Sequence, residues 1–109
     1  MATTYKVLAQ SNPSATTATT LYTVPAATST VVSTIAVANL GGSSATYRIA
    51  VRPAGESLAN KHYIAYDVTV GATDTTTLTL GITLATTDVI TVYASNANLA
   101  FNAFGSEIA

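Results

Sequence analysis

His62 is the residue of this chain best suited to acid–base chemistry, and charged residues lie near it in the sequence. Glu56, Lys61 and Asp67 flank it, and an imidazole beside carboxylates can transfer protons or bind a metal ion. A zinc or calcium site needs several ligands at a defined spacing, whereas the chain has one histidine and no cysteine. We therefore expect a hydrogen-bonded or solvated His62, with no catalytic role and no bound metal.

Hydroxyl and carboxyl groups elsewhere in the sequence also lack a catalytic pattern. Ser57 and Ser106 are not part of a Gly-x-Ser-x-Gly nucleophile elbow. Asp74 and Asp88 lie in threonine-rich turns, where an aspartate side chain commonly accepts hydrogen bonds from backbone N–H groups. We predict no catalytic residue and no cofactor, and expect a protein that is not an enzyme.

The composition limits the classes of partner. Only 8% of the 109 residues are charged and the net charge is −1, so no basic surface is available to bind the phosphates of a nucleic acid. No apolar run reaches the roughly 18 residues of a membrane-spanning helix. The N-terminus does not have the basic and then apolar pattern of a secretory signal. We expect synthesis in a cytoplasm, no membrane association, and stability from packing and backbone pairing rather than disulfides.

Apolar residues alternate with threonine and alanine through most of the chain, a period-two pattern that is typical of β-strands. Turn residues separate these segments at residues 12–14, 40–44, 71–74 and 86–88. We predict a single all-β domain over residues 1–109, an antiparallel β-sandwich or jelly roll of about seven to nine short strands. Residues 1–20 are expected to form a first strand or an extended N-terminal arm.

The same alternation assigns side chains to the core. The expected inward residues are Val31, Ile35 and Val37 of residues 30–39, Tyr47, Ile49 and Val51 of residues 46–53, and Ile64, Tyr66, Val68 and Val70 of residues 61–70. Gly41 and Gly42 are expected to turn the chain between two antiparallel strands. Gly81 is expected to bend or bulge the segment around it.

Four residues are candidates for an interface. Arg48 and Arg52 share the outward parity of one strand, and outward arginines are suited to bidentate contacts with carboxylates of a neighbouring chain. Tyr63 and Tyr93 have the opposite parity to the core residues of their strands. They are expected either to form an exposed aromatic surface or to be covered by a second layer or another copy of the chain.

Several strand blocks resemble small virion structural proteins of tailed bacteriophages, especially those of cyanophages. The blocks are Leu-Tyr-Thr-Val-Pro at residues 21–25, Tyr-Arg-Ile-Ala-Val-Arg-Pro-Ala-Gly at 47–55, Asn-Lys-His-Tyr-Ile-Ala-Tyr-Asp at 60–67, and Phe-Asn-Ala-Phe-Gly-Ser-Glu-Ile at 101–108. The resemblance covers nearly all of the chain after residue 20 and includes no catalytic motif. It implies a non-enzymatic β-sandwich component of a virion, made in the cytoplasm of a bacterial host.

The expected function is therefore that of a structural subunit that docks on other virion proteins, in the tail, baseplate or fibre region, and that forms a homo-oligomer. Capsid decoration, as a cement protein, is the alternative place in the particle. An alternative of a different class is a carbohydrate-binding module for glycans of the host surface, because sandwiches display aromatic side chains that stack on sugars. Its first residues to test are Tyr63, Tyr93, Asn96 and Asn98.

Overall fold

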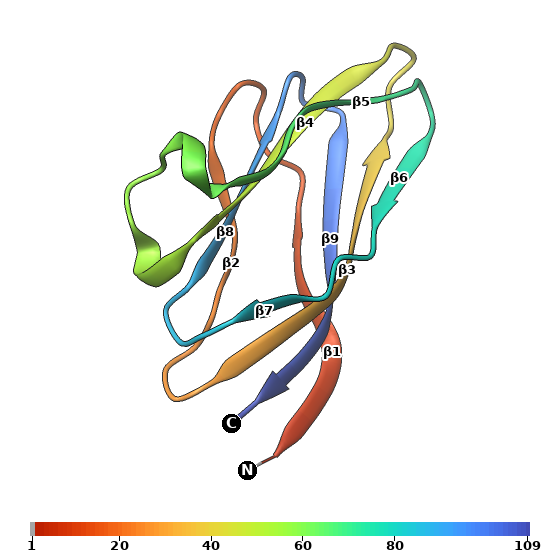
Figure 1. Cartoon of the computed structure of the whole chain (residues 1–109). Coiled ribbons are helices and arrows are strands. Elements are labelled where there is room, and N and C mark those ends of the chain that lie inside the picture. The colour runs from red at the N-terminus through yellow and green to blue at the C-terminus, as the bar shows by residue number, and fades with distance from the viewer. Residues whose placement is uncertain (1) are drawn as a thin grey trace.

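The computed structural model describes residues 2–109 and consists of nine strands with two short 3-10 turns (Figure 1). The strands are β1 (Thr3–Ser11), β2 (Thr19–Thr23), β3 (Ser29–Asn39), β4 (Ala45–Arg52), β5 (Tyr63–Val70), β6 (Thr75–Leu78), β7 (Ile82–Leu84), β8 (Val89–Ala94) and β9 (Leu99–Ile108). The turns are η1 (Pro53–Gly55) and η2 (Asn60–His62), both between β4 and β5.

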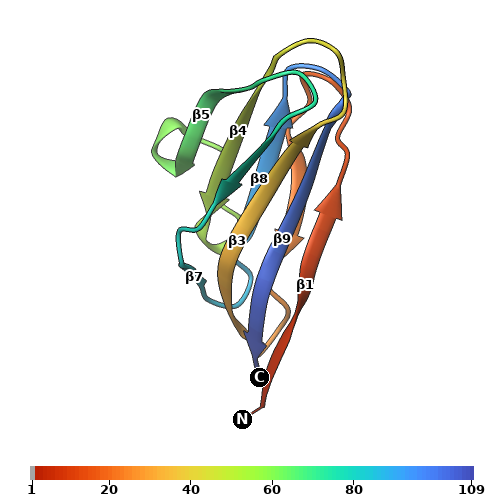
Figure 2. The ribbon, with the colours of Figure 1, turned by 90° about the vertical axis from the view of Figure 1, so that its right-hand side faces the viewer.

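The strands form two sheets that pack face to face (Figure 2). The first sheet has the order β1-β9-β3-β6, and β7 also pairs with β3. The second sheet has the order β2-β8-β4-β5, and the pairing in both sheets is antiparallel. The predicted all-β sandwich is confirmed. Residues 3–11 form a strand that pairs with β9 from Thr3 to Ser11, with one register shift between Val7 and Ala9.

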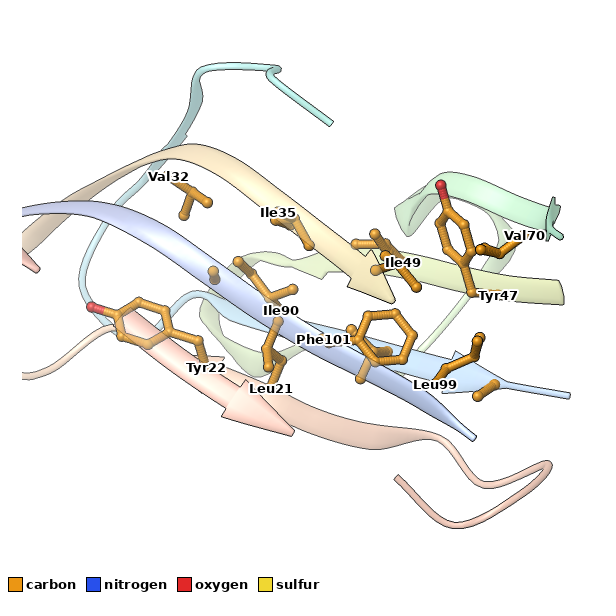
Figure 3. Close-up of a cluster of buried hydrophobic side chains, with 14 of the residues drawn as sticks. Leu21, Tyr22, Val32, Ile35, Tyr47, Ile49, Val70, Ile90, Leu99 and Phe101 are labelled. Atoms are coloured by element: carbon orange, nitrogen blue, oxygen red, sulfur yellow. The ribbon is translucent and has the colours of Figure 1, made fainter. Parts of the chain in front are cut away.

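The core lies between the two sheets and contains the largest apolar side chains of both (Figure 3). Tyr47 and Ile49 of β4 face Leu99 and Phe101 of β9, and all four are fully buried. The rings of Tyr47 and Phe101 meet edge to face with their centroids 6.2 Å apart, an arrangement that aromatic pairs prefer. The inward assignment of Tyr47 and Ile49 is confirmed, and Val51 is partly buried against the same cluster.

The turn at Gly41 and Gly42 does not form the expected hairpin. It leads from β3 in the first sheet to β4 in the second, and residues 71–74 lead back from β5 to β6. Asn39 connects these two crossings. Its Nδ2 donates to the carbonyl oxygens of Ser43, Val70 and Gly71, at 2.8, 3.2 and 3.2 Å, and its Oδ1 accepts the Gly41 N–H at 2.9 Å. A glycine pair permits both a hairpin turn and a crossing between sheets. The hydrogen bonds of buried Asn39 stabilise the crossing.

A β-bulge in β3 overturns one of the predicted faces. The register between β3 and β9 shifts between Val32 and Thr34, so the alternation of side chains reverses there. Val32 is therefore buried and Val31 is only partly buried, whereas Ile35 and Val37 are buried as predicted.

A similar irregularity overturns part of the prediction for β5. Val70 is buried and Val68 packs on the core, but Ile64 and Tyr66 are 43% and 56% exposed. The register against β4 shifts twice, and Asp67 has a φ of 50°. An extra residue in one strand of a pair turns the following side chains to the other face.

The bend expected at Gly81 is confirmed as a break between two strands. β6 ends at Leu78 and β7 begins at Ile82, and Gly81 has a φ of 63°. Glycine adopts this left-handed conformation without a steric penalty.

Two core tyrosines differ in how their hydroxyl groups are satisfied. The Tyr22 hydroxyl accepts from Thr30 Oγ1 at 2.9 Å and donates to Glu107 Oε2, and Glu107 also binds Lys6 Nζ at 2.8 Å. Burial, followed by the contact with Glu107, raises the pKa of Tyr22 to about 12. Hydrogen bonds from Lys6 and then from Tyr22 lower the pKa of Glu107. The Tyr47 hydroxyl, by contrast, is buried without a hydrogen-bond partner among residues 2–109, and burial raises its pKa.

Removing these two hydroxyl groups should have opposite effects on stability. We expect Tyr47→Phe to leave the free energy of unfolding unchanged or to raise it by about 1 kcal/mol, since it removes a polar group that pays its desolvation cost without a partner. Tyr22→Phe should lower that free energy by about 1–2 kcal/mol, because Thr30 and Glu107 lose a partner. Urea unfolding of both variants measures the difference, and equal losses in the two would contradict it.

Candidate functional site

The outer face of the second sheet carries a cluster of aromatic and charged side chains around Arg48. Arg48 of β4 lies directly opposite Tyr93 of β8, and its guanidinium carbon is 4.4 Å from the centre of that ring. On its other side the same carbon is 4.2 Å from the centre of the Tyr66 ring of β5. A guanidinium held over two aromatic faces is stabilised by cation–π attraction on both.

Asp67 fixes the direction of this guanidinium. Arg48 Nε donates to Asp67 Oδ1 at 2.6 Å, with a longer contact of 3.4 Å from Nη2 to Oδ2. This hydrogen bond is the main reason that the pKa of Arg48 is raised even above its usual high value. Tyr66 and Asp67 are consecutive residues, and both reach Arg48 because the bulge interrupts the alternation of β5 there.

Tyr63 extends the cluster toward the end of the sheet. Its ring meets that of Tyr66 edge to face, with centroids 4.9 Å apart and planes 82° apart. Tyr63, Tyr66 and the exposed Asn60 line an open hollow of about 370 Å³. We call Arg48, Tyr63, Tyr66, Asp67 and Tyr93 the tyrosine–arginine cluster.

Of the four residues selected from the sequence, the structure brings three together and places the fourth beside them. Arg48, Tyr63 and Tyr93 belong to the tyrosine–arginine cluster. Arg52 donates from Nε to Thr91 Oγ1 at 3.0 Å and from Nη1 to the Glu56 carbonyl oxygen at 3.0 Å. It therefore holds the 53–62 loop against the sheet rather than projecting from it.

Sequence reasoning missed Tyr66, the most exposed residue of the cluster's three tyrosines. Uninterrupted alternation back from Val70 and Val68 assigns Tyr66 to the core, and the bulge that turns it outward depends on pairing with β4. No local signal in the sequence identifies the bulge, because an aromatic residue beside a charged one also occurs at Tyr47 and Arg48, where β4 pairs with β8 in regular register.

His62 is buried, and its hydrogen bonds close the loop between β4 and β5. Its Nδ1 accepts the Ala59 N–H at 3.0 Å, so the proton is on Nε2, which donates to Glu56 Oε1 at 3.1 Å. Lys61 Nζ lies 3.4 Å from the same oxygen. Hydrogen bonds from His62 and then from Lys61 lower the pKa of Glu56. The expectation that His62 is hydrogen-bonded is confirmed. Asp67, which lies near His62 in the sequence, forms its ion pair with Arg48.

The remaining polar candidates shape turns. Asp74 Oδ1 accepts the Thr75 N–H at 2.8 Å, and Asp88 Oδ2 accepts the Ala85 N–H at 2.9 Å, which confirms the predicted capping. Asn96 Oδ1 accepts the Asn98 N–H at 2.9 Å and so orders the turn between β8 and β9. Within residues 2–109, no three histidine, aspartate or glutamate side chains lie close enough together to hold a metal ion.

Comparisons with family models, curated proteins and solved structures return no match to this chain. No helix among the described residues is long and apolar enough to span a membrane. The class that the fold defines is an antiparallel β-sandwich, and the outer face of its second sheet carries the tyrosine–arginine cluster.

Proposed function

We propose that this protein is a non-enzymatic structural subunit that docks on other proteins through the tyrosine–arginine cluster. The observation that carries the proposal is the fixed position of Arg48 between two tyrosine rings, where Asp67 balances its charge. Tyrosine and arginine dominate the binding energy of many protein interfaces. Because Arg48 is already held by three neighbours, a partner that binds here orders few further side-chain torsions.

The setting that we propose is the virion of a tailed bacteriophage, assembled in the cytoplasm of its bacterial host. The resemblance of the strand blocks to small virion structural proteins supports this setting. The scarcity of charged residues also suits a subunit that other chains cover on several sides. We propose the tail, baseplate or fibre region as its place, with capsid decoration as the second possibility.

Shortening Tyr66 tests the docking surface without disturbing the core. Tyr66 is 56% exposed, so Tyr66→Ala should change the free energy of unfolding by less than about 1 kcal/mol. If Tyr66 is part of the interface, its loss should cost about 2 kcal/mol of binding, or more than tenfold in occupancy when binding is limiting. The measurement is quantitative mass spectrometry of purified particles grown in the bacterial host.

The matched control is Leu40→Ala, because Leu40 is a large exposed side chain, 69% accessible, that lies outside the cluster. This variant should be incorporated like the wild type. Absence of the wild-type chain from purified particles would contradict the virion proposal, and full incorporation of Tyr66→Ala would contradict docking through the cluster.

A carbohydrate-binding module is the second candidate, favoured by the hollow lined by Asn60, Tyr63 and Tyr66. Exposed tyrosine rings beside an amide can stack on a sugar and accept or donate hydrogen bonds to its hydroxyl groups. Of the residues selected from the sequence for this function, Tyr63 lines the hollow. Binding on a glycan array that Asn60→Ala abolishes would support this candidate, and an array without signal at high protein concentration would exclude it.

A further inference from the structure

The edges of the two sheets differ in how readily they could accept another strand. Within residues 2–109, one lateral edge of the first sheet is β1, and the other is formed by β6 and β7, which both pair with β3. The lateral edges of the second sheet are β2 and β5. An edge strand presents unpaired N–H and C=O groups, and proteins usually protect such strands by making them short or irregular.

Three of these four edges are short or irregular. β2 has five residues and a register shift, and Pro25 follows two residues after its end. β5 contains two register shifts. β6 and β7 have four and three residues, and Gly81 separates them with a positive φ. None of them offers a long regular ladder to a second chain.

β1 is the exception. It has nine residues and a register shift only after Val7, and its first five residues, from Thr3 to Val7, are all exposed and pair with β9 in regular register. The ladder continues past the strand, because Ala2 and Ala109 exchange two backbone hydrogen bonds of 2.7 and 2.9 Å. Figure 2 shows this half of β1 running along the rim of the first sheet toward the two termini. The backbone of the edge is therefore held in the extended conformation that a new strand requires.

The outer face beside this edge is apolar. Tyr5 and Val7 are 84% and 48% exposed, and Phe104, directly opposite Val7 on β9, is 37% exposed. Tyr5 and Phe104, together with Val31 and others, line an open hollow of about 540 Å³. A partner strand next to β1 would bury part of this apolar surface in addition to the backbone groups.

We propose that β1 pairs with β1 of a second copy of this chain, antiparallel and about a two-fold axis at Tyr5. In this register Tyr5 lies opposite the second Tyr5, Thr3 opposite Val7, and Thr4 opposite Lys6. Residues directly opposite each other in an antiparallel pair lie on the same face, and Thr3, Tyr5 and Val7 share one parity and so satisfy this requirement in both copies.

A second copy fits this edge because the segment is self-complementary in charge and side-chain type. Lys6 is its only charged residue, and Glu107 of the same chain neutralises it at 2.8 Å. In this register each Lys6 lies opposite Thr4, so like charges are not directly opposed, and the two Tyr5 rings form a cross-strand aromatic pair of the kind that stabilises sheets. The two-fold axis closes the assembly at a dimer, because the β1 edge of each copy is then paired and cannot bind a third chain.

A charge at the centre of this contact tests the proposal. We expect the wild-type protein to form a dimer in sedimentation equilibrium, and Tyr5→Lys to raise its dissociation constant by about tenfold or more, since it places two lysines directly opposite each other. The control is Thr20→Lys, an exposed position on the β2 edge, which should leave the dissociation constant unchanged. A wild-type monomer at all concentrations, a higher closed oligomer, or a dimer that Tyr5→Lys leaves intact would overturn the proposal.

Cross-linking provides a second readout that locates the contact. The chain has no cysteine, so Tyr5→Cys introduces a single thiol, and directly opposed strand residues are close enough for a disulfide. Mild oxidation should give a covalent dimer from Tyr5→Cys and not from Thr20→Cys; equal cross-linking of both would count against the register. The contact is on a different sheet from the tyrosine–arginine cluster, so either proposal can fail without the other.

Discussion

Gly105→Ala is expected to destabilise the protein by about 3 kcal/mol or more, because the added methyl group would collide with backbone atoms. A Cβ at Gly105 would lie 2.0 Å from the Val31 carbonyl oxygen and 3.0 Å from Val31 C and Val32 Cα. Backbone atoms inside a sheet cannot move aside as the end of a side chain can. The variant should therefore unfold at a much lower urea concentration than the wild type.

The position of Gly105 explains the size of this effect. It lies in β9, opposite Lys6 of β1 on one side and Val32 of β3 on the other, next to the register shifts in both pairs. A glycine in a strand commonly marks such a close approach of another backbone. Relief of the collision would separate β9 from β3, the pair that forms the centre of the first sheet.

Gly42→Ala is the matched control. A Cβ there would meet no atom within 4 Å, and the φ of Gly42 is not positive. This substitution should change the free energy of unfolding by less than about 0.5 kcal/mol, or stabilise slightly by restricting the unfolded chain. Similar urea midpoints for the two alanine variants would contradict the role given to Gly105.

Asn39→Asp is expected to produce the second large loss of stability, about 3 kcal/mol at neutral pH, although the two side chains have nearly the same shape. It replaces the Nδ2 group, which donates to the carbonyl oxygens of Ser43, Val70 and Gly71, by an oxygen that repels them. The hydrogen bond from the Gly41 N–H to Oδ1 remains. The loss should shrink at acid pH, where the new carboxyl group takes up a proton and can donate one hydrogen bond.

Asn102→Asp is the control for this prediction. The Asn102 side chain uses its Oδ1, which accepts from Gln10 Nε2 at 2.7 Å in an exposed contact, and a carboxylate keeps that acceptor. Its free energy of unfolding should stay within about 0.5 kcal/mol of the wild type. If urea unfolding at neutral and acid pH shows equal losses for the two aspartate variants, the donor contacts of Asn39 are not what joins the two crossings.

The sequence by itself determined the fold class and much of the core. Alternation over residues 30–39 and 46–53 places Ile35, Tyr47 and Ile49 between the sheets, and all three are buried. This part of the structure was predictable because side-chain direction in a regular strand depends only on the parity of the residue. The turns capped by Asp74 and Asp88 were predictable for the same local reason.

Only the tertiary structure decided which strands are partners and where the alternation breaks. Residues 40–44 pass between the sheets instead of closing a hairpin, and the bulges in β3 and β5 turn Val31 and Tyr66 toward solvent. These features depend on the strand that lies alongside, which is distant in the sequence. The candidate site was likewise predictable only in part. The parity of the sequence selected Arg48 and Tyr93. Tyr66 and Asp67 contact Arg48 because β5 has more residues than the stretch of β4 with which it pairs.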